Sequence, residues 1–314
     1  MTGGIQVLAL AADLQALIEV RPMQGFLVHS VFDHAANLLT GDDLLVTLLS
    51  RDRDMTPLGL IADVPSLADL DLREGDRLVL DGRQSLILPR QTGRLILTGA
   101  KTLPVRLESA KGEQKVSPPA LELIQKKLIL ADSAGIAPLA SWLPQGQDLP
   151  DKAGNVYCAF IGRDLKAFLD DLEAGESRAA LDKASRLIGF GPGLTPACDD
   201  FLAGILLWLY YRGADPAFGR QMARQARDRT TLVSAHMISH AAAGRANGLY
   251  LALIKAALEG DLDRLADSID RVLAYGASSG ADFLFGFYAA ASLGASEASM
   301  VGLVPQLDKI RKIS

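Results

Sequence analysis

The sequence is poor in the residues that mark secreted or nucleic-acid-binding proteins. It has only two cysteines, Cys158 and Cys198, which argues against a disulfide framework and favours a reducing compartment. Its 32 basic residues are outnumbered by 37 acidic ones and form no basic run, so no nucleic-acid partner is expected. The first twenty residues contain neither Lys nor Arg, which argues against a secretory signal. We therefore expect a cytoplasmic protein.

Long apolar runs are also missing. Phe201–Tyr211 is too short to cross a bilayer, and the longer run 277–294 carries Asp282 among many small residues. Hydrophobic residues nevertheless make up 49% of the chain, which is ample material for a core. We expect buried core helices at both places and no membrane partner.

The first third of the chain is predicted to be β-rich. Short apolar runs alternate there with turn residues, a pattern typical of a small barrel or sandwich. The runs are Gly25–Ser30, Asp43–Leu49, Arg77–Leu80, Ser85–Leu88, Arg94–Thr98 and Val105–Leu107. Asp81-Gly82, between two of these runs, predicts a hairpin turn.

From about residue 156 the chain is predicted to be almost wholly helical. The expected helices are Asp164–Ala174, Arg178–Ile188, Ala197–Tyr211, Phe218–Arg229, Leu232–Ala243, Leu249–Leu258 and Leu262–Leu273. The predicted class is therefore α+β. Its parts are a β-rich domain over 1–112, a linker with one helix over 113–155, and a helical domain over 156–314 that carries two glycine-rich motifs.

The first motif reads Gly189-Phe-Gly-Pro-Gly-Leu-Thr-Pro-Ala-Cys-Asp-Asp200. Its alternate glycines permit positive φ and close approach of a ligand to the backbone. Thr195 before Pro196 predicts a helix start with Thr195 as the N-cap. Free N–H groups at such a start favour an anion, so Gly191, Gly193 and Thr195 are candidate phosphate-binding residues. The alternative is an ordinary capped turn between two helices.

Two adjacent carboxylates, Asp199 and Asp200, open the helix that follows this motif. The next residues, Phe201 to Trp208, are apolar on every side, so the helix start is expected to be buried. Buried carboxylates are costly unless they are paired, hydrated or metal-bound. They would also repel a phosphate, a conflict that Mg²⁺ or a substrate amino or amide group would resolve. No cofactor is firmly indicated, and Mg²⁺ at Asp199 and Asp200 is the one considered.

The second motif is a partial repeat of the first. Asp200-Phe-Leu-Ala-Gly204 and Asp282-Phe-Leu-Phe-Gly286 share the pattern Asp-Phe-Leu-x-Gly, and each follows a glycine-rich turn. We predict that the two helix starts converge on one cleft, with Ser278, Ser279, Gly280 and Asp282 contributed by the second. The alternative is that both are glycine-mediated helix packings with capped ends.

Several residues outside the two motifs are further candidates. Ser234 is a plausible hydroxyl donor to the same cleft, and Arg245 is a candidate anion clamp. His236 and His240 have the spacing of helical metal ligands, although a structural pair is favoured. Cys198 lies in a first helical turn, where a thiol pKa tends to fall, but it has no evident base partner.

The first motif also carries a family resemblance. Gly-Phe-Gly-Pro-Gly-Leu-Thr-Pro-x-x-Asp-Asp-Phe-Leu-Ala-Gly resembles the hallmark of the AllH-type subunit of oxamate carbamoyltransferase. Similar segments are Thr230-Thr231 with Ser234 and His240, Ser279-Gly280-x-Asp282, and Ala36-Asn37-Leu38-Leu39, so the resemblance spans most of the chain. Two places depart from it: Ala197-Cys198 stands where the family has Ser-Gly, and Ala277 where a His is usual.

The resemblance implies a transferase subunit in allantoin-derived purine nitrogen metabolism. The reaction would interconvert oxalurate plus phosphate with oxamate plus carbamoyl phosphate, in an oligomer with other subunits. Thr195 and Ser279 would donate hydrogen bonds to the developing oxyanion, and Asp199, Asp200 and Asp282 would orient substrate or partner groups. Two alternatives are a non-catalytic anion-binding or regulatory subunit, and a metal-dependent hydrolase that uses the three aspartates.

Overall fold

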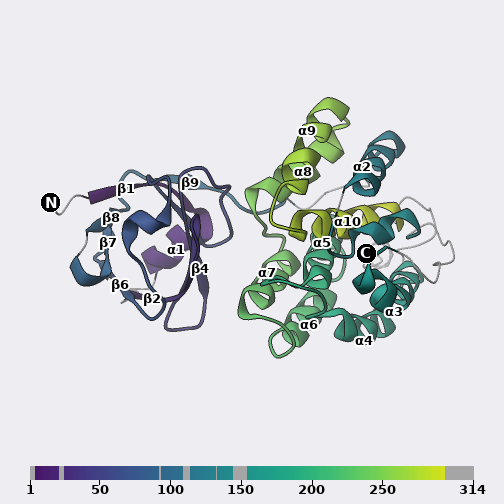
Figure 1. Ribbon diagram of the computed structural model, residues 1–314, viewed down its shortest axis with the longest axis horizontal. Coiled ribbons are helices and arrows are strands. Elements are labelled where there is room, and N and C mark those ends of the chain that lie inside the picture. Colours follow the sequence, from purple (N-terminus) through teal and green to yellow (C-terminus); the bar gives the residue numbers. More distant parts are fainter. Residues whose placement is uncertain are drawn as a thin grey trace, which may run out of the picture. The chain divides into compact units, whose positions relative to one another are not determined.

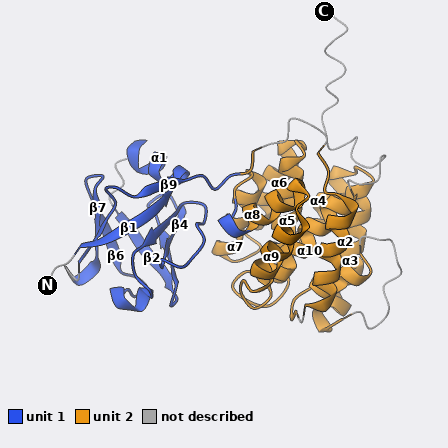
Figure 2. Cartoon of the chain, turned by 90° about the horizontal axis from the view of Figure 1, so that it is seen from above, with its two compact units in different colours: residues 1–106, 246–249 blue, residues 107–245, 250–314 orange. Residues whose placement is uncertain are grey.

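The chain forms two compact units. The computed structural model describes residues 4–20, 25–91, 93–108, 114–131, 133–143 and 154–293. Unit 1 comprises residues 1–106 and 246–249, and unit 2 comprises residues 107–245 and 250–314 (Figure 2). Strands occupy unit 1 and long helices occupy unit 2 (Figure 1), which confirms the predicted α+β class.

Unit 1 is a closed barrel of eight strands with a short ninth strand. Its elements are β1 (Gly4–Ala11), α1 (Ala12–Val20), β2 (Gly25–Val31), β3 (Ala35–Leu39), β4 (Leu45–Leu49), β5 (Gly59–Ala62), η1 (Leu67–Leu70), β6 (Arg77–Asp81), β7 (Ser85–Ile87), η2 (Pro89–Gln91), β8 (Arg94–Ile96) and β9 (Lys101–Leu103). The strand order is β5-β4-β3-β2-β6-β7-β8-β1, and β1 closes the ring by pairing with β5. Side chains such as Val7, Leu38 and Leu95 are fully buried and fill the interior.

The strands differ from the prediction in three ways. Val105–Leu107 does not form a strand, and β9 lies just before it. The predicted hairpin exists, but Asp81 pairs with Ser85, so its turn is a three-residue loop that begins at Gly82. The prediction also lacked β1, β3 and β5, which are rich in Ala and Gly, residues that are depleted in strands.

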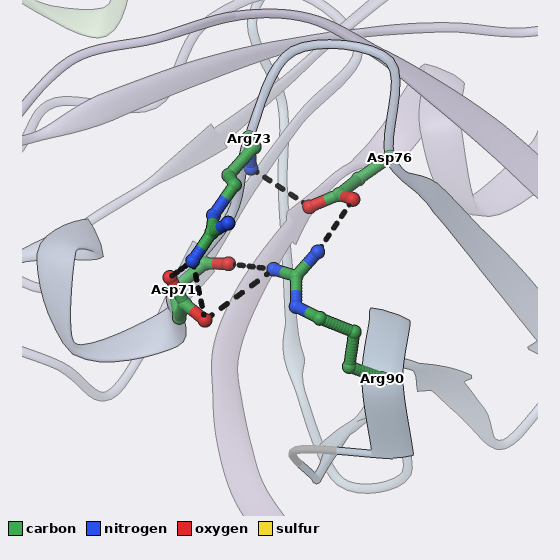
Figure 3. A network of polar contacts seen from close by, with 4 residues as sticks. All are labelled: Asp71, Arg73, Asp76 and Arg90. Atoms are coloured by element: carbon green, nitrogen blue, oxygen red, sulfur yellow. Dashed lines mark hydrogen bonds and ion pairs between the residues drawn. The ribbon is translucent and has the colours of Figure 1, made fainter.

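A polar network fastens two turns of unit 1 to each other (Figure 3). Arg90 donates to the Asp71 carbonyl oxygen and, at 2.7 Å, to Asp76 Oδ1, while the Arg73 N–H donates to Asp76 Oδ2 at 2.8 Å. The hydrogen bond from Arg90 lowers the pKa of the Asp76 carboxyl. Asp71 and Arg90 both have positive φ, so the network holds two backbone conformations that such residues rarely adopt.

Unit 2 is a helical assembly centred on two buried helices. Its elements are α2 (Pro118–Leu130), η3 (Ala137–Ser141), α3 (Val156–Glu173), α4 (Ser177–Leu187), α5 (Ala197–Tyr211), α6 (Pro216–Ala226), α7 (Leu232–Ala242), α8 (Gly248–Glu259), α9 (Leu262–Leu273) and α10 (Ser279–Leu293). Helices α5 and α10 form the most extensive helix pair. Nearly every residue of both is buried, as the sequence predicted. Within the described ranges, no helix is long and apolar enough to span a membrane.

The region predicted as a linker contains part of unit 2. Helix α2 packs against α9, α10 and η3, and unit 2 begins at residue 107 where the prediction put a boundary at 112. Residues 113, 132 and 144–153 of the predicted linker lie outside the described residues, as do residues 109–112 at the end of the predicted β-rich domain.

Candidate functional site

The first glycine-rich motif forms a loop that joins α4 to α5. Gly189, Gly191 and Gly193 all have positive φ, as their spacing predicted. A methyl group on Gly189 would lie 2.3 Å from the Arg229 carbonyl oxygen, and one on Gly191 would lie 2.6 Å from the Ala197 nitrogen. These two glycines therefore allow close backbone packing. Gly193 differs, because it is exposed and the nearest atom to such a methyl group is 3.7 Å away.

The loop leaves several backbone donors available. Hydrogen bonds within the described residues engage the N–H groups of Gly189, Phe190 and Cys198. They do not engage those of Gly191, Gly193, Leu194, Thr195 or Ala197. Gly193 and Leu194 face solvent. A run of unengaged N–H groups at a helix start is a typical anion-binding arrangement.

The predicted role of Thr195 as N-cap is wrong. Pro196 occupies the cap position of α5, which has no side-chain cap hydrogen bond. The Thr195 hydroxyl instead lies 2.9 Å from the Ser279 hydroxyl at the start of α10. The two helix starts therefore lie side by side, as the repeated motif predicted.

Helix α7 begins beside the same loop. Its N-cap residue Thr231 accepts a hydrogen bond from the Ser234 N–H and donates one to the Leu194 carbonyl oxygen at 2.7 Å. The starts of α5, α7 and α10 thus gather around residues 194 and 195. Their dipoles place positive potential at this point of unit 2.

Asp199 is a fully buried anchor for the loop. Gly189 N–H donates to its Oδ1 at 2.8 Å, and the Thr230 hydroxyl donates to its Oδ2. Burial raises the pKa of the Asp199 carboxyl, while Thr230, Gly189 and Ser234 oppose the shift. Because both oxygens are engaged, Asp199 fastens the glycine-rich loop to the start of α7.

Asp200 is equally buried but has weaker support. Its Oδ2 has no hydrogen-bond partner among the described residues. Burial raises the pKa of this carboxyl well above its usual value, and the Asp282 charge raises it further. The Ser279 and Thr195 hydroxyls act in the opposite direction, so they lie close to the carboxyl.

Asp282 holds a turn against the start of α10. Its Oδ1 accepts hydrogen bonds from Ile136 N–H at 2.7 Å and Ala137 N–H at 2.9 Å, where η3 begins. Burial raises the pKa of the Asp282 carboxyl to about 6, although these donors and Ser278 oppose the shift. A methyl group on Gly135 would lie 2.0 Å from Asp282 Oδ2, so only glycine fits at that position of the turn.

The other predicted residues differ in where they lie and in what they contact. Ser234 lies near Asp199, and Ser278 lies near Asp282. Gly280 serves helix packing, since a methyl group there would lie 1.7 Å from the Val272 carbonyl oxygen. Arg245 follows the C-terminal end of α7, and the adjacent Gly244 contacts Tyr210 near the C-terminal end of α5. Arg245 is therefore at the far end of both helices, roughly 20 Å of helix from the site.

The cysteines and histidines show no reactive arrangement. Both cysteines are buried, and burial raises the pKa of the Cys198 thiol, the reverse of the fall expected from its first-turn position. The His236 and His240 rings lie 6.3 Å apart on α7. Among the residues that the structure describes, no three His, Cys, Asp or Glu side chains are grouped to hold a metal ion. Magnesium at Asp199 and Asp200 stays a prediction.

The structure adds contacts that the sequence did not predict. Thr230 and Gly189 hold Asp199, and Gly135 lies against Asp282. Tyr250 on α8 stacks on Phe283 at 3.6 Å, and its hydroxyl is buried without a partner among the described residues. Burial raises the pKa of that hydroxyl, and the charges of Asp200 and Asp282 raise it further. These contacts join segments far apart in sequence, so only the Thr230-Thr231 pair gave a local signal.

Two family models match the chain. The model of the AllH N-terminal domain family matches residues 6–105, which is the barrel. The model described as oxamate carbamoyltransferase subunit AllH matches residues 187–291, which include the glycine-rich loop, Asp199, Asp200 and Asp282. No solved structure matches the chain. Since the two matches together span more than half of the 314 residues, the chain belongs to the AllH family of oxamate carbamoyltransferase subunits.

Proposed function

We propose that this chain is the subunit of a carbamoyltransferase-like enzyme that binds the small anionic substrate, and that carbamoyl phosphate is that substrate. The phosphate would lie on the N–H groups of Gly191, Gly193 and Leu194. The reaction would be the exchange between oxalurate plus phosphate and oxamate plus carbamoyl phosphate, or its counterpart with a related small carboxylate or amide. Other subunits of the complex would complete the site.

One observation carries this proposal. The exposed part of the glycine-rich loop offers backbone donors that the described residues do not use, at the point where α5, α7 and α10 begin. Backbone N–H groups and helix dipoles act together on an anion at such a place. The Thr195 and Ser279 hydroxyls, half-buried beside the loop, would donate to the carbonyl oxygen where charge develops.

A regulatory or purely anion-binding role is the second candidate. Both oxygens of Asp199 are engaged, and Asp282 Oδ1 accepts from the start of η3, so two of the three aspartates have structural partners. On this alternative the loop still binds an anion, and the reacting groups come from another subunit.

Gly193 offers a sharp test of the loop. Gly193→Ala adds a methyl group to a residue with φ of 96°, where no atom lies closer than 3.7 Å. The strain of that conformation for alanine, on the order of 1–2 kcal/mol, should displace the donors and weaken carbamoyl phosphate binding roughly tenfold. Isothermal titration calorimetry of the purified chain measures this change.

Gly213→Ala is the matched control. Gly213 also has positive φ, with open space around it, but it follows the C-terminal end of α5. Its substitution also places an alanine at positive φ and should leave carbamoyl phosphate affinity unchanged. Equal weakening in both variants would show that general destabilisation, and not the loop, controls binding.

A further inference from the structure

Two buried carboxylates lie in the gap between the starts of α5 and α10. The helices touch at Gly204 and Gly286, where an added methyl group would lie 2.4 Å and 1.9 Å from a carbonyl oxygen of the other helix. Asp200 and Asp282 each lie four residues before one of these glycines, and therefore on the same face of their helix. Helical side chains lean toward the N-terminus of their own helix. Both carboxylates therefore point away from the contact and into the gap between the two helix starts.

The hydroxyl pair of Thr195 and Ser279 lies at the outer end of this gap. The two oxygens are 2.9 Å apart, and both residues are half-buried. The exposed residues Gly193 and Leu194 of the glycine-rich loop directly precede Thr195. A ligand held on the loop is therefore next to the hydroxyl pair, and a small group that reaches past the pair enters the gap.

The gap contains buried oxygens that lack hydrogen-bond donors. Oδ2 of Asp200 and Oδ2 of Asp282 have no partner among the described residues, although the two residues are only 1% and 0% exposed. The hydroxyl of Tyr250 on α8 is a third such oxygen, and its ring stacks on Phe283, the residue after Asp282. Burial raises the pKa of this hydroxyl, and the charges of Asp200 and Asp282 raise it further, which agrees with that placement. Buried acceptors of this kind are costly unless a donor reaches them.

We propose that the gap receives the NH₂ group of carbamoyl phosphate, and that Asp200 and Asp282 accept hydrogen bonds from its two N–H bonds. The phosphate stays on the loop. The carbonyl oxygen accepts from the Thr195–Ser279 pair, whose side chains turn about their Cα–Cβ bonds to admit the group. The two carboxylates are then specificity-determining residues, because they distinguish a carbamoyl phosphate from an acyl phosphate. This inference rests on the proposed function and deepens it.

An amide NH₂ is the small uncharged group whose chemistry fits these oxygens. It offers two donors and no acceptor. The methyl group of an acyl phosphate has a similar size but donates nothing, so it would leave the buried oxygens unpaired. This assignment also explains how acids and an anion share one site. The carboxylates face the uncharged end of the ligand, while its phosphate lies on backbone donors.

Calorimetric titration of the full chain with three ligands tests the assignment. The ligands are carbamoyl phosphate, acetyl phosphate, which has a methyl group in place of NH₂, and inorganic phosphate, which has neither. We expect the wild type to bind carbamoyl phosphate roughly a hundredfold more tightly than acetyl phosphate.

Asp282→Asn reverses the hydrogen-bonding character of one wall of the gap. The asparagine keeps an oxygen for the N–H groups of Ile136 and Ala137, which places its own NH₂ at the position of Oδ2. Two sets of N–H donors then face each other, so the preference for carbamoyl phosphate should drop below about tenfold. Asp261→Asn is the matched control, because it removes the same charge from an exposed helix cap of unit 2 and should keep the full preference.

The wild-type comparison needs no variant and stays decisive if Asp282→Asn folds poorly. Equal affinity of the wild type for carbamoyl phosphate and acetyl phosphate would overturn this inference and leave the anion site standing. An undiminished preference in a folded Asp282→Asn protein would overturn it as well. If the wild type binds none of the three ligands, the proposed anion site is also wrong.

Discussion

Three buried aspartates of similar exposure have different partners in this protein. Asp199 has both oxygens hydrogen-bonded, and Asp282 has one oxygen that accepts from two backbone N–H groups. Asp200 has two nearby hydroxyls, and both Asp200 and Asp282 have one oxygen without a partner among the described residues. The sequence predicted that these acids are buried, because the helix after Asp200 is apolar all round. It could not assign their roles, since the partners come from residues 136, 189, 230 and 279.

Asp282 should make the free energy of unfolding decrease as pH rises. Its folded pKa of about 6 lies above the usual 3.8, so the native state holds the proton more tightly than the unfolded chain. Stability therefore falls as pH rises from about 4 to about 6, and the ionised carboxylate destabilises the protein above that range. Between pH 5 and pH 7.5 this change amounts to roughly 1–2 kcal/mol.

Asp282→Asn removes that titration and keeps an oxygen for Ile136 and Ala137. Urea unfolding of both proteins at several pH values measures the effect. The stability of the wild type relative to the variant should fall by the stated amount as pH rises from 5 to 7.5. A difference that stays constant, or that grows with pH, would contradict the assignment of a raised pKa to Asp282.

At the scale of elements, the repeated Asp-Phe-Leu-x-Gly pattern is a reciprocal helix contact. A methyl group on Gly204 of α5 would lie 2.4 Å from the Phe283 carbonyl oxygen. One on Gly286 of α10 would lie 1.9 Å from the Phe201 carbonyl oxygen. Each glycine thus faces the residue that follows the aspartate of the other repeat. The sequence left two alternatives open: convergence of the two helix starts, and glycine-mediated packing of the two helices. Both occur, because the packing brings the helix starts together.

Gly286→Ala should strongly destabilise unit 2. The obstructing atoms are backbone atoms of Phe201, which cannot rotate away, so the helices must separate at a cost on the order of 3 kcal/mol. Gly219→Ala in α6 is the matched control, because its nearest obstacle is the Ala242 side chain at 3.0 Å and alanine favours a helix. Urea midpoints should drop clearly for the first variant and little for the second. Equal midpoints would refute the close contact.

Helices were more predictable than strands for a physical reason. The 3.6-residue period predicted α9 with its observed bounds, because this signal is local. Strands β1, β3 and β5 are rich in Ala and Gly, and they are stabilised by partners elsewhere in the barrel. The prediction for Thr195 was wrong for the same reason. The local pattern indicated an N-cap, but the Thr195 hydroxyl lies against the hydroxyl of Ser279, which is 84 residues away in the sequence.

At the scale of the whole molecule, the chain returns to unit 1 after most of unit 2 has been made. Residues 246–249 belong to unit 1, where Ala246 N–H donates to the Val105 carbonyl oxygen and Gly248 N–H donates to that of Met55. No periodicity or turn signal in the sequence indicates this return, because it depends on pairing over long sequence separation. Unit 2 in turn contains every candidate site residue, so the proposed anion site depends on the folding of unit 2.

The most direct measurement is a calorimetric titration of the intact chain with carbamoyl phosphate at pH 6, with and without Mg²⁺, beside the double variant Thr195→Val with Ser279→Ala. We predict saturable binding at one site that does not require Mg²⁺ and that the double variant loses. Binding that requires Mg²⁺, or that survives in the double variant, would contradict the hydroxyl pair and loop as the anion site. Absence of binding by the wild type would contradict the central claim itself.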